Sequence, residues 1–476
     1  MTHSKLSRRQ IIKSAALGSA AVFAAPYVKT SYAAGTLALG VWDHWVPGAN
    51  NTLTKLCNEW GAKNNCQVTI DYITSQGEKD KLTAAAEAQA GTGHDIMSHR
   101  DWNVRIHQEQ LEPLDDVVNG LIKQYGPISP VAEYLAKIKG TWRGVPTAVG
   151  SQVKPCCSRF DLYQQHAGID LRDIFPADES KWDKAKVDNW NWDTYLASAQ
   201  KLHAAGFPVG LAMGQTSDAV DWVGALFNSY GVVMVDAKDN IKINSDETRA
   251  ALEYLKKLMA VNPPEVYAWD DAGNNRWLIS GKGSSIMNPP EVYAWDDAGN
   301  NRWLISGKGS GIMNPPSAWA VANRDHPEVG QNCWTHPMPH GPKGRFVGQL
   351  PQFYGVWNFS KNKQAAKDLL TYISQKDSVA QLVQASSGYD LPSFKTMYDL
   401  PTWQTVGPPV GTVYGYPPRG DEQTSMAGAP ARSEVGAQIY NQAINTVMVA
   451  KVTQGNEKID DVIKWAENEL QGTLRV

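Results

Sequence analysis

The sequence predicts an α/β fold, with a parallel sheet that carries helices on both faces. Two observations lead to this prediction: strand-like runs alternate with helical stretches, and the helical stretches carry apolar stripes at helical spacing. The chain has 476 residues, which suits two large domains or three smaller ones. With 42% hydrophobic and 20% charged residues, its composition is that of a globular protein, and not of a disordered chain or a membrane bundle.

The first strands and helices alternate in the order that a parallel sheet requires. The apolar run Thr36–Trp42 predicts a strand, and residues 51–63 predict a helix. Gln67–Ile73 alternates in hydropathy as a strand, Leu82–Ala90 is an alanine-rich helix, and Asp95–Met97 is a short apolar strand. Ligands of such sheets sit beyond the carboxyl ends of the strands.

Four later stretches have the apolar stripe of a helix that packs on a core. Trp192–Ala205 repeats its apolar residues at helical spacing, and Asp246–Met259 begins after Ser245 with acids in its first turn. Lys363–Ser374 and Lys458–Gln471 show the same pattern. We interpret these stretches as core-facing helices and not as parts of a cofactor site.

A tandem repeat interrupts this order. Asn262–Met287 recurs as Asn288–Met313, and the two 26-residue copies differ only at Ser285 and Gly311. Two copies do not make a solenoid, which needs about three or more stacked units. We therefore expect one copy to be surplus to the fold, and continuity with the following segment favours the second copy as the structural one. The first copy is then expected to be a poorly packed excursion.

The N-terminus has the features of an export signal. Ser7–Lys13 resembles the twin-arginine signal, and a short apolar run and small residues follow it. Residues 1–33 are expected to be cleaved, which gives a soluble periplasmic protein. No cysteine lies near the cleavage site, so a lipoprotein is not expected. The five cysteines show no metal spacing, and Cys57 with Cys66 is either a disulfide or two buried thiols.

Charge and aromatic content narrow the class of partner. All five charged residues among the first 33 are basic, which leaves 40 basic against 48 acidic residues in the rest of the chain. This acidic balance argues against binding to nucleic acid or anionic lipid. The chain has 18 tryptophans and only 9 phenylalanines. Because an indole N–H needs a partner when buried, some of these rings are expected to line a surface that stacks on a sugar.

The order of several segments resembles a known family. These segments are Leu37–Trp45 (LALGVWDHW), His94–Met97, Leu111–Asp116, Gly140–Val149, Gly281–Trp319, Met338–Phe359 and Ser387–Pro392 (SGYDLP). In this order the chain is similar to the extracellular solute-binding proteins of ATP-binding cassette importers, of the carbohydrate-binding type that includes maltose-binding protein. The resemblance implies a two-lobed periplasmic-binding-protein fold (type 2), in which hinge-linked lobes close on a ligand in the cleft between them.

The resemblance also implies a division of the chain and a set of partners. The first lobe would comprise residues 34–149 and about 314–357, and the second would comprise 150–313 and 358–476. The protein would be a monomer that captures a small carbohydrate or polyol and delivers it to the membrane permease of the importer. No cofactor, metal or nucleic acid is implied. The sequence leaves the ligand open, since glycerol phosphate, a polyamine or an opine would also suit such a cleft.

Candidate ligand residues follow from the ends of strands and from the family's contact positions. Aromatic residues would stack on a sugar ring, and polar residues would bind its hydroxyl groups. The set implied in this way is Trp42, Asp43, His44, Trp45, His99, Asp101, Trp102, Ser151, Gln152, Trp222, Trp319, Gln352 and Tyr389.

The alternative class is a secreted carbohydrate-active hydrolase or lyase. Adjacent acids occur at Asp115/Asp116 and at Asp270/Asp271. A glycosidase needs two carboxyl groups that face each other across the scissile bond, about 5 to 9.5 Å apart, and neighbours in sequence do not establish that. The sequence contains no GxGxxG, P-loop, GxSxG or HExxH motif. We therefore expect no catalytic residue and favour a binding protein.

Overall fold

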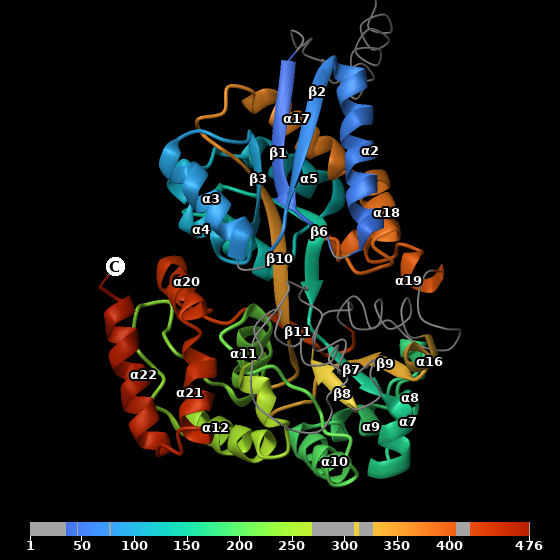
Figure 1. Cartoon of the computed structure of the whole chain (residues 1–476), viewed down its shortest axis with the longest axis vertical. Coiled ribbons are helices and arrows are strands. Elements are labelled where there is room, and N and C mark those ends of the chain that lie inside the picture. The colour runs from blue at the N-terminus through green and yellow to red at the C-terminus, as the bar shows by residue number, and fades with distance from the viewer. Residues whose placement is uncertain are drawn as a thin grey trace, which may run out of the picture.

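The computed structural model of the chain has two lobes, stacked along the long axis of the molecule (Figure 1). It describes residues 35–44, 46–75, 78–268, 309–313, 327–405 and 419–475. The expected signal therefore lies outside the described residues. Each lobe has a hydrophobic core of its own, and helices cover sheets in both, so the predicted α/β fold is confirmed. Among the described helices, none combines the length and apolarity needed to cross a membrane.

The sheet of the first lobe begins with the three predicted strands. β1 (Gly35–Trp42) lies between β2 (Cys66–Ile73) and β3 (Ile96–Arg100), and all three run parallel. Two long strands complete the sheet: β10 (Phe346–Val356) pairs antiparallel with β3 and with β6 (Val145–Val153). Both β6 and β10 continue toward the second lobe (Figure 1), so they form the connection between the lobes.

Helices on both faces of this sheet bury apolar stripes against it. α2 (Pro47–Asn64) buries Leu53, Leu56 and Trp60, which recur at helical spacing. Cys57 and Cys66 are both buried free thiols, so the unpaired interpretation of these cysteines holds. The other elements of the lobe are α3 (Lys79–Ala90), α4 (Asn103–Ile106), α5 (Asp115–Tyr125), α6 (Pro130–Ala136), β4 (Lys137–Ile138), β5 (Thr141–Trp142), α17 (Lys363–Ile373), α18 (Lys376–Ala385) and α19 (Thr402–Thr405).

The second lobe is mostly helical around a small antiparallel sheet. β7 (Cys156–Arg159) pairs with both β8 (Gly311–Met313) and β9 (Cys333–His336). At its centre lies α11 (Ser217–Tyr230), which is buried on nearly all sides. The other elements are α7 (Phe160–Leu162), α8 (Leu171–Ile174), α9 (Lys184–Asn189), α10 (Trp192–Ala204), α12 (Asp246–Met259), α16 (Pro327–Gly330), β11 (Gln423–Ser425), which pairs with the start of β10, α20 (Ser433–Asn441), α21 (Ile444–Thr453) and α22 (Ile459–Thr473).

The predicted helices are confirmed, and so is the start of α12 after Ser245. The Asn191 side chain accepts a hydrogen bond from Thr194 N at the start of α10, and Ser245 does the same from Thr248 N at the start of α12. The stripe of α12 buries Leu255 and Leu258, as its spacing predicts.

The two cores divide the chain differently from the expected boundaries. Residues 314–357 were expected in the first lobe, but β9 packs in the second core. Residues 358–476 were expected in the second lobe, but α17 and α18 pack in the first core through residues such as Leu369 and Leu382. The physical reason is that β10 passes through both lobes: Val347 lies in the second core and Phe353 in the first. The chain after β10 therefore returns to the first lobe before it enters the second again.

The tandem repeat meets the described structure only at its two ends. At the start of the first copy, Asn262 accepts a hydrogen bond from Leu211 N at 3.0 Å, and Val266 is fully buried. The end of the second copy forms β8 (Gly311–Met313). The first copy was expected to be poorly packed throughout, but its residues 262–268 pack in the second lobe. Residues 269–308 lie outside the described residues. The second core thus contains the beginning of the first copy and the end of the second copy, which together are what a single copy would supply.

Deleting Asn262–Met287 should leave a folded protein with an unchanged or higher melting temperature, because Asn288 and its followers then take the places of Asn262 and its followers. Deleting Asn288–Met313 instead gives the same chain with Ser285 in place of Gly311. A β-carbon at Gly311 would lie 2.9 Å from Ser158 Oγ, which is hydrogen-bonded to His336 at 3.0 Å. This second deletion should therefore be less stable by about 1 to 3 kcal/mol.

Thermal unfolding of the two deletion variants measures this difference directly. Loss of folding in the first variant would mean that both copies are structural. Equal stability of the two variants would mean that the serine is accommodated in β8.

Candidate functional site

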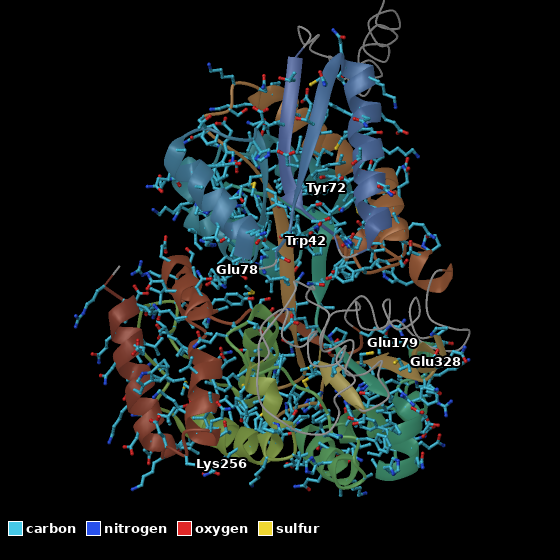
Figure 2. The ribbon with its side chains drawn as sticks, viewed as in Figure 1. Trp42, Tyr72, Glu78, Glu179, Lys256 and Glu328 are labelled. Carbon is cyan, nitrogen blue, oxygen red and sulfur yellow. The ribbon has the colours of Figure 1, made fainter. Side chains whose placement is uncertain are left out.

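The carboxyl ends of β1, β2 and β3 meet at the edge of the first sheet that faces the second lobe. Trp42 lies at this edge, close to where the lobes meet (Figure 2). Because the three strands are parallel, the residues that follow them gather along one line. The edge therefore combines residues from strand ends, from the connecting strands and from the SGYDLP loop.

Trp42 is the centre of an aromatic group at this edge. Its ring centroid lies 4.8 Å from that of His44 and 6.4 Å from that of Tyr389, and its Nε1 donates to Ser75 Oγ at 3.2 Å. Gly150 has a positive φ of 82°, and a β-carbon there would lie 2.9 Å from Trp42 Cε3. Glycine is thus required on two counts, since both the left-handed backbone and the close ring exclude a side chain.

Asp390 joins this group from the SGYDLP loop. Its Oδ1 accepts hydrogen bonds from Gly150 N at 2.7 Å and from His44 Nε2 at 3.0 Å. Val46 N donates to His44 Nδ1 at 2.9 Å, so Nδ1 carries no proton and Nε2 is the donor to Asp390. We call Trp42, His44, Gly150, Tyr389 and Asp390 the Trp42 cluster. It links β1, β6 and the C-terminal loop at one point.

The connecting strands bring three amide and hydroxyl side chains to the same edge. Ser151 Oγ donates to Thr147 O at 2.6 Å and accepts from Gln352 N at 2.8 Å, so this hydroxyl holds the two strands together. The Oε1 atoms of Gln152 and Gln352 are buried, and neither has a hydrogen-bond partner among the described residues. A buried amide oxygen without a partner costs about 1 to 3 kcal/mol, which a ligand hydroxyl would relieve.

Charged groups continue along the edge into the second lobe. Lys81 Nζ lies 3.2 Å from Asp101 Oδ2, and Lys154 Nζ lies 2.8 Å from Asp218 and 2.7 Å from Asp221 on α11. Burial raises the pKa of Asp221 to about 6, while Lys154 opposes the rise and Asp101 adds to it. Burial alone would lower the pKa of Lys154, but the two carboxylates raise it. Lys154 is therefore a fully buried ammonium that ties the connecting strand to the second lobe.

A groove of about 430 Å³ runs between the lobes beside these charges. Its volume lies in the range of small-molecule sites. The first lobe lines it with polar residues of α3 and α4, and the second lobe lines it with the start of α11 and the end of α20. Its polar lining consists of Glu78, Lys81, Asn103, His107, Gln215, Thr216, Ser217, Tyr440 and Asn441.

Three residues of the expected ligand set lie in the cores. Trp102 and Trp222 are fully buried, and Trp222 Nε1 donates to Ala212 O at 2.7 Å. His99 is fully buried against Trp357, at 5.3 Å between ring centroids, and burial lowers its pKa well below the ordinary value. In this structure, none of the three offers a face to a ligand.

The remaining expected residues divide into four groups. Trp42, His44 and Tyr389 contact one another at the edge, whereas Asp101, Ser151, Gln152 and Gln352 are buried at the ends of β3, β6 and β10. Asp43 is exposed, and its carboxylate accepts from Asn50 Nδ2 at 2.7 Å. Trp45 and Trp319 lie outside the described residues.

Two residues of the site were missed from the sequence. Asp390 is next to Tyr389 in the SGYDLP loop. Its role depends on a hydrogen bond with His44, which is 346 positions away and therefore leaves no local sequence pattern. In the sequence, Lys154 is an ordinary lysine that follows a strand. Only the fold shows that it pairs with the carboxylates of α11. Among the described residues, no three His, Cys, Asp or Glu side chains gather in a way that could hold a metal ion.

Solved structures share this architecture over most of their length. The maltose-bound MalE3 of T. maritima is 17% identical, covers 92% of this chain and 99% of its own, and has a TM-score of 0.66. The GacH receptor of Streptomyces glaucescens, solved unliganded and with acarbose, is 16% identical over 93% and 99%, with a TM-score of 0.66. A sugar transporter protein of Arthrobacter chlorophenolicus with bound laminaribiose is 15% identical over 92% and 99%, with a TM-score of 0.65.

At these identities the likeness concerns the fold, and it confirms the expected two-lobed periplasmic-binding-protein fold (type 2). No curated protein sequence matches the chain. The family model of bacterial extracellular solute-binding proteins, however, matches residues 47–380, well over half of the chain. Members of this family bind solutes and are not enzymes. The chain therefore belongs to the bacterial extracellular solute-binding proteins.

Proposed function

We propose that the chain is the periplasmic substrate-binding component of an ATP-binding cassette importer, and that it captures a sugar or related polyol between its lobes. The observation that carries this proposal is the Trp42 cluster, an aromatic group beside buried polar atoms at the edge between the lobes. A sugar presents an apolar C–H face to such rings and hydroxyl groups to the amides of Gln152 and Gln352. The solved proteins with maltose, acarbose and laminaribiose support a carbohydrate ligand.

In this proposal the ligand reaches the permease through lobe closure. A solute that contacts both lobes stabilises the closed arrangement, and the membrane permease then recognises that arrangement. The strands β6 and β10 act as the hinge, since they carry the chain between the lobes. Residues 1–33 act as a twin-arginine signal that exports the folded monomer to the periplasm before cleavage.

The alternative of a carbohydrate-active hydrolase or lyase finds no support in the described acids. Asp115 Oδ1 accepts from Trp142 N at 3.2 Å, and Asp116 lies 3.2 Å from Lys367 Nζ. Both carboxylates thus hold α5 to its neighbours. The second pair, Asp270/Asp271, lies outside the described residues.

Replacing Trp42 by alanine should weaken sugar binding at least about fivefold, or roughly 1 kcal/mol. The ring is only 6% exposed, so the variant should also be less stable. Binding is therefore measured by calorimetry well below the unfolding transition. Trp42→Phe is the matched control, because it keeps an aromatic face and should keep the affinity within about threefold. Equal affinities of wild type and Trp42→Ala would contradict this site.

A further inference from the structure

We propose that the cleft selects a sugar that carries an amino group, and that Asp390 receives its ammonium. This inference rests on the proposed sugar-binding function and names the ligand class more closely. It is carried by the geometry of Asp390, by the rings around it and by the pairing of the neighbouring charges.

Asp390 is a fully buried carboxylate, and only one of its two oxygens has a hydrogen-bond partner among the described residues. Its Oδ1 accepts from Gly150 N and from His44 Nε2, whereas Oδ2 has no hydrogen-bond partner among the described residues. His44 does not neutralise it, because the bond from Val46 N leaves Nδ1 without a proton and the imidazole uncharged. No lysine or arginine of the described chain forms an ion pair with Asp390. A buried charge in this condition is unfavourable until a cation arrives.

The rings of the Trp42 cluster also favour a cation. Trp42 and Tyr389 lie within 6.4 Å of each other, and His44 lies 5.0 Å from Tyr389, all between ring centroids. An ammonium near aromatic faces is attracted by their quadrupoles, most strongly for tryptophan. A carboxylate beside such rings therefore recognises an amine better than it recognises a neutral hydroxyl.

The neighbouring charges disfavour an anionic ligand. Three cations along the edge are each held by two carboxylates: Lys81 by Glu78 and Asp101, Arg100 by Glu78 and Asp80, and Lys154 by Asp218 and Asp221. None of these three cations therefore remains to face a carboxylate or phosphate on the ligand. Acidic groups outnumber basic ones there, so the local potential favours a cationic ligand.

Matched sugars test this selection. Glucose, glucosamine and glucuronate, and the galactose series, are titrated by calorimetry into the chain without its signal at pH 7 and low salt. We expect the amino sugar to bind at least tenfold more tightly than its neutral parent, and the uronate to bind at least tenfold more weakly. Asp390→Asn keeps the acceptor for Gly150 and His44 but removes the charge, so the preference for the amine should fall below about twofold. Asp246→Asn, at a fully exposed carboxylate, is the control and should keep the preference.

The outcomes separate this inference from the proposed function. If neutral and amino sugars bind equally, or if uronates bind more tightly, the inference is overturned while sugar binding stands. If a folded Asp390→Asn keeps the preference, the inference is also overturned. If Asp390→Asn does not fold, the ratio of amine to parent in the wild type decides the matter. If no sugar of either series binds, the proposed function itself fails.

Discussion

A chain in which Lys154 is replaced by methionine is expected to lose about 3 to 5 kcal/mol of its free energy of unfolding at pH 7.5. Lys154 is completely buried between Asp218 and Asp221, and methionine leaves both carboxylates without their cation. Unpaired buried charges cost far more than exposed ones, because the surrounding protein solvates them poorly. Lys184→Met is the matched control: its ammonium pairs with Asp188 at the surface, so its loss should change stability by less than about 1 kcal/mol.

The loss in free energy of unfolding caused by Lys154→Met should be smaller at pH 5 than at pH 7.5. Burial raises the pKa of Asp221 from its ordinary 3.8 to about 6 in the folded chain, against the effect of Lys154. A carboxyl whose pKa is raised by folding binds more protons in the folded state, so its contribution to stability falls as pH rises through this interval. Without Lys154 the pKa of Asp221 rises further, and the loss above pH 6 grows. Urea unfolding of wild type and variant at pH 5 and 7.5 measures the loss in stability at each pH. A small loss that is independent of pH would contradict the role of Lys154 as the cation that pairs with Asp218 and Asp221.

Trp102→Ala should also lower the free energy of unfolding by about 3 to 5 kcal/mol. The ring is fully buried, lies edge-on to Tyr134 at 5.6 Å between centroids, and packs against Gly436 of α20. Its loss would leave a cavity between α4, α6 and α20. Since the ring packs on Tyr134 and Gly436, the folded variant should keep its affinity for the sugar. Trp465→Ala, at a partly buried ring of α22, is the control and should cost less.

Chemical unfolding and calorimetry on the same samples decide between the two roles of Trp102. A small loss of stability together with a large loss of affinity would return Trp102 to the ligand set that its position after β3 implied.

Most helices and strands could be predicted because their apolar periodicity is local. The stripe of α12 and the cap at Ser245 are both contained in a short stretch of sequence. The lobe boundaries could not be predicted in the same way. The stripe of α17 shows that Leu369 and Leu370 are buried, but not which of two cores buries them. Only the path of β10 through both lobes decides that.

The contacts of the candidate site could be predicted only in part, for a similar reason. A tryptophan that follows a strand has the same sequence signature whether it lies at the edge between the lobes, as Trp42 does, or is fully buried in a core, as Trp102 is. Asp390 meets His44 across 346 positions and Gly150 across 240, so its role depends on contacts that no local pattern records. No local pattern predicts Tyr389 or Gln352 as ligand residues; only the resemblance to a family implies them.

The measurement that tests solute binding most directly is a calorimetric titration of the chain without its signal with neutral mono- and disaccharides and their amino derivatives, followed by analysis of the recovered sugar. We expect that one sugar molecule binds per chain and is recovered intact, and that sugar at 100 times its dissociation constant raises the free energy of unfolding by about 2.7 kcal/mol. If no sugar binds, or if new reducing ends are released during incubation, the protein is not a sugar-binding component of an importer.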